Sequence, residues 1–138
     1  MHEIVVGIDE SATSLHAARR AAEIAVALDQ PLHLVMAVKN GMSFGIQVGT
    51  DAFQVDWVTS AAQFLKETCG ELPVPNATYA LGGKDPAKSL LEEAERLDAS
   101  MIVVGNRRVQ GAARLLGAIA TDVMHHAHCD VLVVNTSS

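Results

Sequence analysis

Short apolar runs rich in β-branched residues recur along this chain, and they constrain its fold more than any other feature. The first, fourth and fifth runs are apolar at successive rather than alternating positions, which is typical of strands buried on both faces. The chain therefore predicts a parallel sheet with helices on either side. The expected strands are Ile4–Ile8, Leu32–Val38, Ala77–Leu81, Met101–Val104 and Val131–Val134.

Between these runs, apolar residues recur at spacings of three and four, as expected for helices that cover a sheet with one face. Ser11 can cap the first helix, and Asp85 places a capping oxygen ahead of Pro86 at the start of another. A connection from Asn40 to Thr50 is expected to lead into a helix over roughly Asp51 to Cys69. The helical stripes are Leu15, Ala18, Ala22 and Ala25; Leu90, Ala94 and Leu97; and Ile119, Val123 and Ala127.

This alternation predicts a single doubly wound α/β domain over residues 1–138, with a five-stranded parallel sheet in the order 3-2-1-4-5 and helices on both faces. Ligands of such sheets bind at the carboxyl ends of the strands, where the strand order reverses. Here the order reverses between the first and fourth strands. The residues that follow Ile8 and Val104 are therefore the candidates for a binding site.

Composition narrows the class of protein. Of 138 residues, 49% are hydrophobic and 19% charged, which excludes a disordered chain, and no apolar run reaches the ~20 residues of a membrane span. The net charge of −6 argues against binding to nucleic acid or to anionic lipid. Cys69 and Cys129 lack the spacing of a disulfide framework or a zinc site, and no secretory signal is recognised, so we expect a cytoplasmic protein.

The segment from Gly105 to Ala118 connects the fourth strand to the helix that follows. Small residues in such a loop let backbone N–H groups approach an anion, and the positive end of the helix dipole favours phosphate there. Asp9 ends the first strand directly across the reversal point, where a carboxylate can accept hydrogen bonds from a ribose. Two plainer interpretations stay open: the glycines only form turns, and Asp9 only begins a helix.

Taken together, several motifs along nearly the whole chain resemble the universal stress protein family. They are Ile4-Val5-Val6-Gly7-Ile8-Asp9-Glu10-Ser11, Gly83-Lys84-Asp85-Pro86, Ile102-Val103-Val104-Gly105-Asn106, Leu115-Leu116-Gly117 and Cys129-Asp130-Val131-Leu132-Val133-Val134. The resemblance implies the 3-2-1-4-5 sheet, a homodimer paired through Val131–Val134 and, in one branch of the family, an ATP site. That site combines the first-strand Asp with a loop of form G-x2-G-x9-G-[ST].

Carried over by position, the resemblance implies Asp9 at the ribose and Ala37 and Val38 beside the adenine. It implies Gly105, Gly111, Gly117 and Ala118 around the phosphates. The rest of the predicted nucleotide site consists of Gly7, Ile8, Asn106, Arg107, Arg108 and Ile119. The expected ligand is ATP or AMP, with cyclic AMP as a further possibility and Mg²⁺ only together with bound phosphates.

This sequence departs from the family's loop pattern. Arg108 stands where the second glycine belongs, eight residues then precede Gly117, and Ala118 replaces the hydroxyl residue. Arg107 and Arg108 can compensate, because guanidinium groups match phosphate oxygens. An alternative function is therefore a nucleotide-free, dimeric stress or chaperone-like interaction protein.

Other features point away from catalysis. His125, His126, His128 and Cys129 crowd the end of one predicted helix but face different directions around it, so we predict no metal site. No nucleophile elbow or pair of carboxylates indicates an enzyme, and we expect at most slow ATP hydrolysis.

Overall fold

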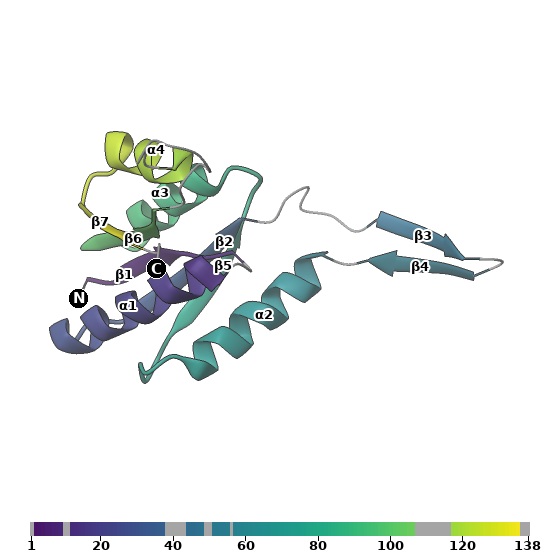
Figure 1. Cartoon of the computed structure of the whole chain (residues 1–138), viewed down its shortest axis with the longest axis horizontal. Helices are drawn as coiled ribbons and strands as arrows, with labels where there is room; N and C mark the ends of the chain where they lie inside the picture. Colours follow the sequence, from purple (N-terminus) through teal and green to yellow (C-terminus); the bar gives the residue numbers. More distant parts are fainter. Residues whose placement is uncertain are drawn as a thin grey trace.

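The computed structural model describes residues 2–9, 12–37, 44–48, 51–55, 57–106 and 117–135, with the backbone alone for 44–48, 51–55, 57 and 58. Figure 1 shows a twisted sheet between two layers of helices. In chain order the elements are β1 (Ile4–Gly7), α1 (Ala12–Leu28), β2 (Leu32–Ala37), β3 (Phe44–Val48), β4 (Asp51–Val55), α2 (Trp57–Glu71), β5 (Thr78–Gly82), α3 (Pro86–Arg96), β6 (Met101–Gly105), α4 (Ala118–His126) and β7 (Asp130–Val134).

The main sheet has five parallel strands in the order β5-β2-β1-β6-β7. Counting only these strands, the order is 3-2-1-4-5, so the predicted fold class is confirmed. The predicted strands agree with the observed ones to within one residue at each end. Apolar runs located them well because both faces of the sheet are covered.

In β1, β2, β6 and β7, residues of the same strand belong to two different cores. Ile4, Val6 and Leu34 belong to the core under α1 and α2, whereas Val5 and Val35 belong to the core under α3 and α4. Figure 1 shows these helix pairs on opposite sides of the sheet. The helices turn the predicted apolar stripes toward the sheet. Because the buried residues of α1 are small, that helix can lie close to the strands; they are Ala17, Ala18, Ala21, Ala22 and Ala25.

The start of α3 matches its prediction. Asp85 is the N-cap, its carboxylate accepts a hydrogen bond from the Lys88 N–H at 3.2 Å, and Pro86 follows at the first helical position. Ser11 lies outside the described residues, so its capping role stays a prediction. Among the described helices, none is both long and apolar enough to cross a membrane.

One part of the predicted topology is wrong. The connection expected from Asn40 to Thr50 contains strand β3, and the first residues of the helix expected from Asp51 form strand β4 instead. The two strands pair antiparallel, Phe44 with Val55 and Val48 with Asp51. Phe44, Ile46 and Val48 recur with period two, and Phe53 and Val55 flank Gln54 in the second segment; this pattern favours strands over a helix. Figure 1 shows this hairpin extending away from the main sheet, with α2 beginning only at Trp57.

Candidate functional site at the carboxyl edge of the sheet

The sheet opens between β1 and β6 at its carboxyl edge. Pairing of β1 with β6 ends at Val6 and Val103. On the outer sides, pairing continues further, to Gly7 with Val35 and to Gly105 with Val134. The next N–H groups also turn outward: that of Ile8 donates to the Val35 carbonyl at 2.9 Å, and that of Asn106 to the Val134 carbonyl at 3.0 Å. β1 and β6 thus stop pairing with each other at the point where the strand order reverses, which is where doubly wound sheets have their ligand crevice.

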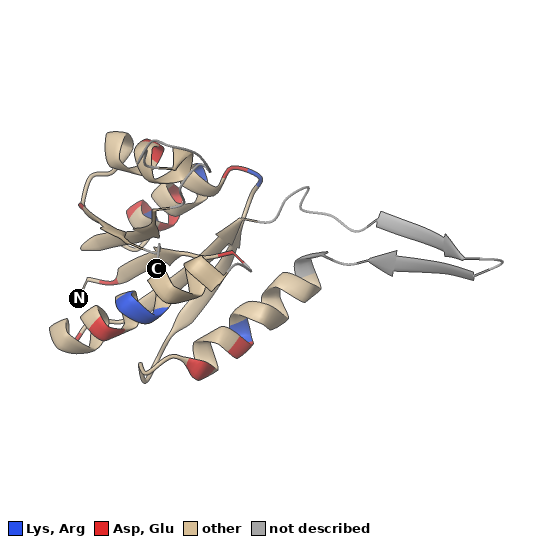
Figure 2. Ribbon diagram, in the orientation of Figure 1, with Lys and Arg blue, Asp and Glu red and all other residues tan. Residues whose placement is uncertain are grey.

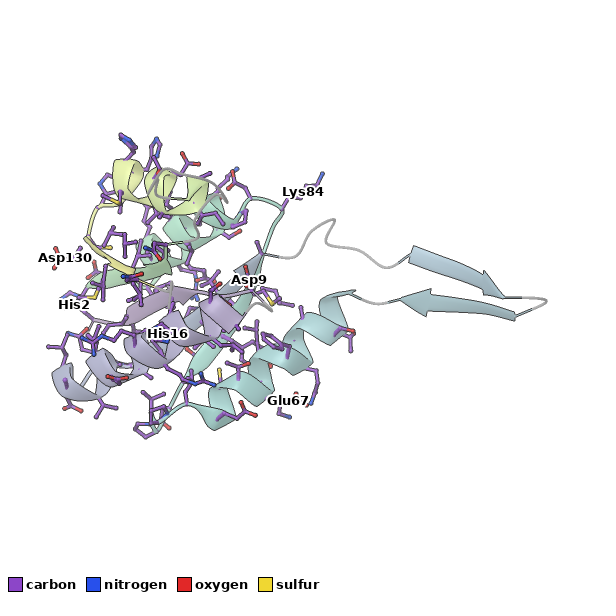
Figure 3. The ribbon with its side chains drawn as sticks, viewed as in Figure 1. His2, Asp9, His16, Glu67, Lys84 and Asp130 are labelled. Carbon is purple, nitrogen blue, oxygen red and sulfur yellow. The ribbon has the colours of Figure 1, made fainter. Side chains whose placement is uncertain are left out.

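Three predicted site residues lie at one level at this edge: Asp9 and Asn106 follow their strands, and Ala37 ends β2. Asp9 lies two residues beyond Gly7, and Ala37 lies two residues beyond Val35, the partner of Gly7. Asn106 follows Gly105, the last residue of β6. The register therefore brings Asp9, Ala37 and Asn106 to the same edge of the sheet; Figure 3 shows Asp9 where β1 runs into α1.

Ser14 fixes the turn that carries Asp9. The Ser14 hydroxyl donates to the Asp9 carbonyl at 2.6 Å and accepts from the Asp9 N–H at 2.9 Å. Both main-chain groups of Asp9 are thereby tied to the first turn of α1, and both residues are half-buried. Sequence reasoning missed Ser14 because it looked for a helix cap at Ser11. The clue was a second serine placed where its hydroxyl can reach back to the end of the strand.

The phosphate side of the predicted site is the start of α4. Gly117 is the N-cap, and as a glycine it has no side chain with which to cap the helix. Its carbonyl accepts from the Thr121 N–H at 3.0 Å, so the helical hydrogen bonds begin there. Ala118 is exposed, whereas the side chain of Ile119 packs against the core. Ile119 can therefore contribute to the predicted site only through its main-chain N–H. Val38, Arg107, Arg108 and Gly111 lie outside the described residues.

Gly7 has a packing role. A Cβ added at this position would come within 2.7 Å of Leu90 Cδ1, and Leu90 is a buried residue of α3. The absence of a side chain at Gly7 therefore lets α3 approach β1. Nothing about its geometry requires a ligand.

The two thiols lie away from this edge and have structural surroundings. Burial raises the pKa of Cys69, whose Sγ lies 3.7 Å from the Thr78 carbonyl. Burial, and then the charge of Asp130, raises the pKa of Cys129. Cys69 lines a hollow of about 430 Å³ between α2 and the start of β5, at the opposite edge of the sheet from Asp9. A raised pKa suppresses the thiolate, so neither cysteine is prepared to act as a nucleophile.

Charged side chains are mixed in sign over the described part of the molecule. Figure 2 shows basic and acidic residues side by side on α1, α2 and α3. Lys84 and Asp85 are consecutive residues between β5 and α3. Within the described residues, no group of three or more His, Cys, Asp or Glu side chains could hold a metal ion.

Comparison with known proteins agrees with this architecture. The Universal stress protein family matches residues 1–135. Universal stress protein A homolog 1 of Coxiella burnetii is 31% identical over 136 residues, which cover 95% of this chain and 94% of that protein. A crystal structure of a universal stress protein in complex with cAMP superposes with a TM-score of 0.72 at 26% identity, over 99% of this chain and 98% of that chain. A universal stress protein from Archaeoglobus fulgidus in complex with dAMP shares the fold, with a TM-score of 0.68 at 23% identity over 98% of both chains. The resemblance predicted from the motifs is thus confirmed, and the chain belongs to the universal stress protein family.

Proposed function

We propose that this chain binds an adenine nucleotide in the crevice between β1 and β6 and acts as a nucleotide-responsive regulatory module. The opening of the sheet beyond Val6 and Val103 carries this proposal. Such an opening at the reversal of strand order is where doubly wound sheets receive nucleotides. The 26% identical neighbour crystallised with cAMP supports a nucleotide of this class.

Each described site residue takes one part of the ligand. The Asp9 carboxylate accepts from the ribose, and the main chain at Ala37 faces the adenine. The first N–H groups of α4, beginning at Ala118, receive the phosphate, because the N-cap Gly117 has no side chain to bind them. Gly105 and Asn106 border the crevice on the β6 side. Further contacts proposed from the family resemblance come from Val38, Arg107, Arg108 and Gly111.

Ala118 affects which nucleotide should bind most tightly. Alanine offers no hydroxyl, and a hydrogen bond to a charged phosphate contributes ~1.5–3 kcal/mol. ATP makes the greatest demand on phosphate donors, so we propose that AMP or cyclic AMP binds at least as tightly as ATP. Mg²⁺ would enter only with a bound polyphosphate.

Isothermal titration of the purified, nucleotide-stripped protein with AMP, cyclic AMP and ATP tests the proposal. Asp9→Asn should weaken binding about tenfold or more, which corresponds to ~1.4 kcal/mol. The matched control is Asp130→Asn, which removes the same charge at the opposite end of the sheet, where β7 begins (Figure 3). An equal loss of affinity in both variants would contradict a specific role for Asp9.

A second candidate function is that of a dimeric interaction protein without a nucleotide. It follows from the departures of Arg108 and Ala118 from the family's loop pattern and from the edge strand β7 of the sheet. Within the described residues β7 pairs only with β6, and its Val131, Leu132 and Val133 are half-buried in one chain. Such an apolar edge favours pairing with a second copy, and we propose a homodimer through Val131–Val134. Absence of binding heat at millimolar nucleotide would favour an interaction protein that works through this dimer. A monomeric mass in sedimentation at micromolar concentration would contradict the dimer itself.

A further inference from the structure

A histidine lies buried near the amino end of β2, at the opposite end of that strand from Ala37. His33 is the second residue of β2, and only 4% of its surface is exposed. It pairs with Val5 of β1 on one side and with Thr78 of β5 on the other. Its neighbour two positions on, Val35, belongs to the core beneath α3, so His33 faces the same helix.

Only one of the two ring nitrogens of His33 has a hydrogen-bond partner in the described part of the chain. Nδ1 lies 2.7 Å from Thr78 Oγ1, a residue of the edge strand. Nε2 is buried without a partner and lies 3.9 Å from Glu93 Oε2 on α3. In either neutral tautomer, a buried donor or a buried lone pair at Nε2 is left unsatisfied. The imidazole thus links β2 to β5 through one hydrogen bond. Its contact with Glu93 on α3, at 3.9 Å, is too long for a hydrogen bond.

The charged groups around His33 come from α3 and from the residue that precedes β1. Glu93 and Arg96 lie on α3, where Arg96 Nε donates to Glu93 Oε2 at 2.7 Å; Glu3 lies just ahead of β1. Burial lowers the pKa of His33 from its ordinary 6.5, and Arg96 adds to that effect; Glu93 and Glu3 oppose it without reversing it. His33 is therefore neutral at neutral pH. A proton added to Nε2 would face Glu93, which already accepts a hydrogen bond from Arg96.

We propose that His33 is a pH-responsive latch that holds the edge strand β5 and helix α3 against β2, and that its protonation in mildly acidic solution loosens both elements. The unfolded chain binds a proton at this residue more readily than the folded chain does. The contribution of the neutral imidazole to the free energy of unfolding is therefore complete above about pH 6.5. This contribution is lost as the pH falls below that value.

The first test is an NMR titration of the His33 ring proton, with the exposed His16 of α1 followed in the same spectra. We expect a midpoint below 6.5 for His33. Glu93→Gln should shift it further down, because an attractive charge is removed, and Arg96→Gln should shift it up. A midpoint at or above 6.5, or one that does not move in Glu93→Gln, would overturn the proposal.

The second test asks whether the effect is local. Amide hydrogen exchange, corrected for the intrinsic effect of pH, is compared at pH 7.5 and 5.5. Protection should fall in β5 and α3 more than in β7, and His33→Gln should abolish this difference. Should that variant not fold, Glu93→Gln serves instead, because it should move the loss of protection to lower pH. A uniform loss along the chain, or the same loss in the variant, would refute the latch.

Discussion

Gly82→Ala should test how closely α3 is seated on the sheet. Gly82 is the last residue of β5 and pairs with Ala37. A Cβ built there would overlap both Oγ and Cβ of Ser89, a residue of α3 that is 6% exposed. Rotating the Ser89 side chain cannot relieve the overlap, because Cβ is fixed to the helix backbone. Either α3 moves away from β5, or the end of β5 bends.

Overpacking of this kind costs ~1–3 kcal/mol. One kcal/mol lowers the melting temperature of a chain of this length by about 4 °C. We therefore expect a drop of roughly 4–12 °C for Gly82→Ala. Urea unfolding followed by far-UV circular dichroism would give the corresponding change in free energy of unfolding.

Two variants make this measurement decisive. Gly83→Ala is the matched control, since a Cβ added at Gly83 meets nothing within 4 Å; its effect should stay within about 0.5 kcal/mol. Ser89→Gly removes the obstructing atoms at the cost of ~0.5 kcal/mol in helix propensity. Combined with Gly82→Ala, it should recover most of the lost stability. Strict additivity of the two changes, or a Gly82→Ala protein as stable as wild type, would refute the reasoning.

Three further changes have defined outcomes. Asp85→Ala removes the cap that binds the Lys88 N–H and should lower the free energy of unfolding by ~1 kcal/mol, seen as a lower urea midpoint. Gly70→Ala, in the last turn of α2 with open space around the new Cβ, should raise the melting temperature slightly, because alanine favours a helix over glycine by up to ~0.8–1 kcal/mol, the value for a helix interior. Ser14→Ala frees the main chain of Asp9 and should weaken nucleotide binding about fivefold in calorimetry, a change of ~1 kcal/mol, whereas Ser14→Thr should retain affinity. Equal affinity of Ser14→Ala and wild type would show that the turn holds its shape without this serine.

The positions of the strands and the buried faces of the helices were predictable because both depend on local pattern, whereas the strand order was predictable because 3-2-1-4-5 is a common order of doubly wound sheets. A strand covered on two faces must be apolar throughout, and Asp85-Pro86 reports a helix start within two residues. The hairpin of β3 and β4 was missed because its glycines suggested a connection. The alternation from Phe44 to Val48 was short enough to be overlooked.

At the candidate site, the sequence identified the edge of the sheet but not its shape. Asp9 and Gly105 could be assigned to neighbouring strands, yet the opening between them depends on where pairing stops, and no single strand encodes that. His33 was hidden for a related reason. The run Leu32–Val38 reads as apolar, and only the packing of α3 makes its one imidazole a buried group facing Glu93.

The crevice and the His33 latch share β2, so their independence can be argued from the geometry of that strand. His33 precedes Ala37 by four residues, a separation of about 13 Å along a strand that rises ~3.3 Å per residue. We expect the imidazolium charge to act weakly on a bound nucleotide because of this distance; salt adds little screening, since His33 is buried. Protonation and nucleotide should therefore be linked only through folding: nucleotide at ~100 times its dissociation constant adds about 2.7 kcal/mol to the folded state whether or not His33 is charged. We expect His33→Gln to leave the nucleotide dissociation constant unchanged at pH 7.5 while altering how the unfolding midpoint depends on pH. A change in both would mean that α3 transmits the state of the latch to the crevice.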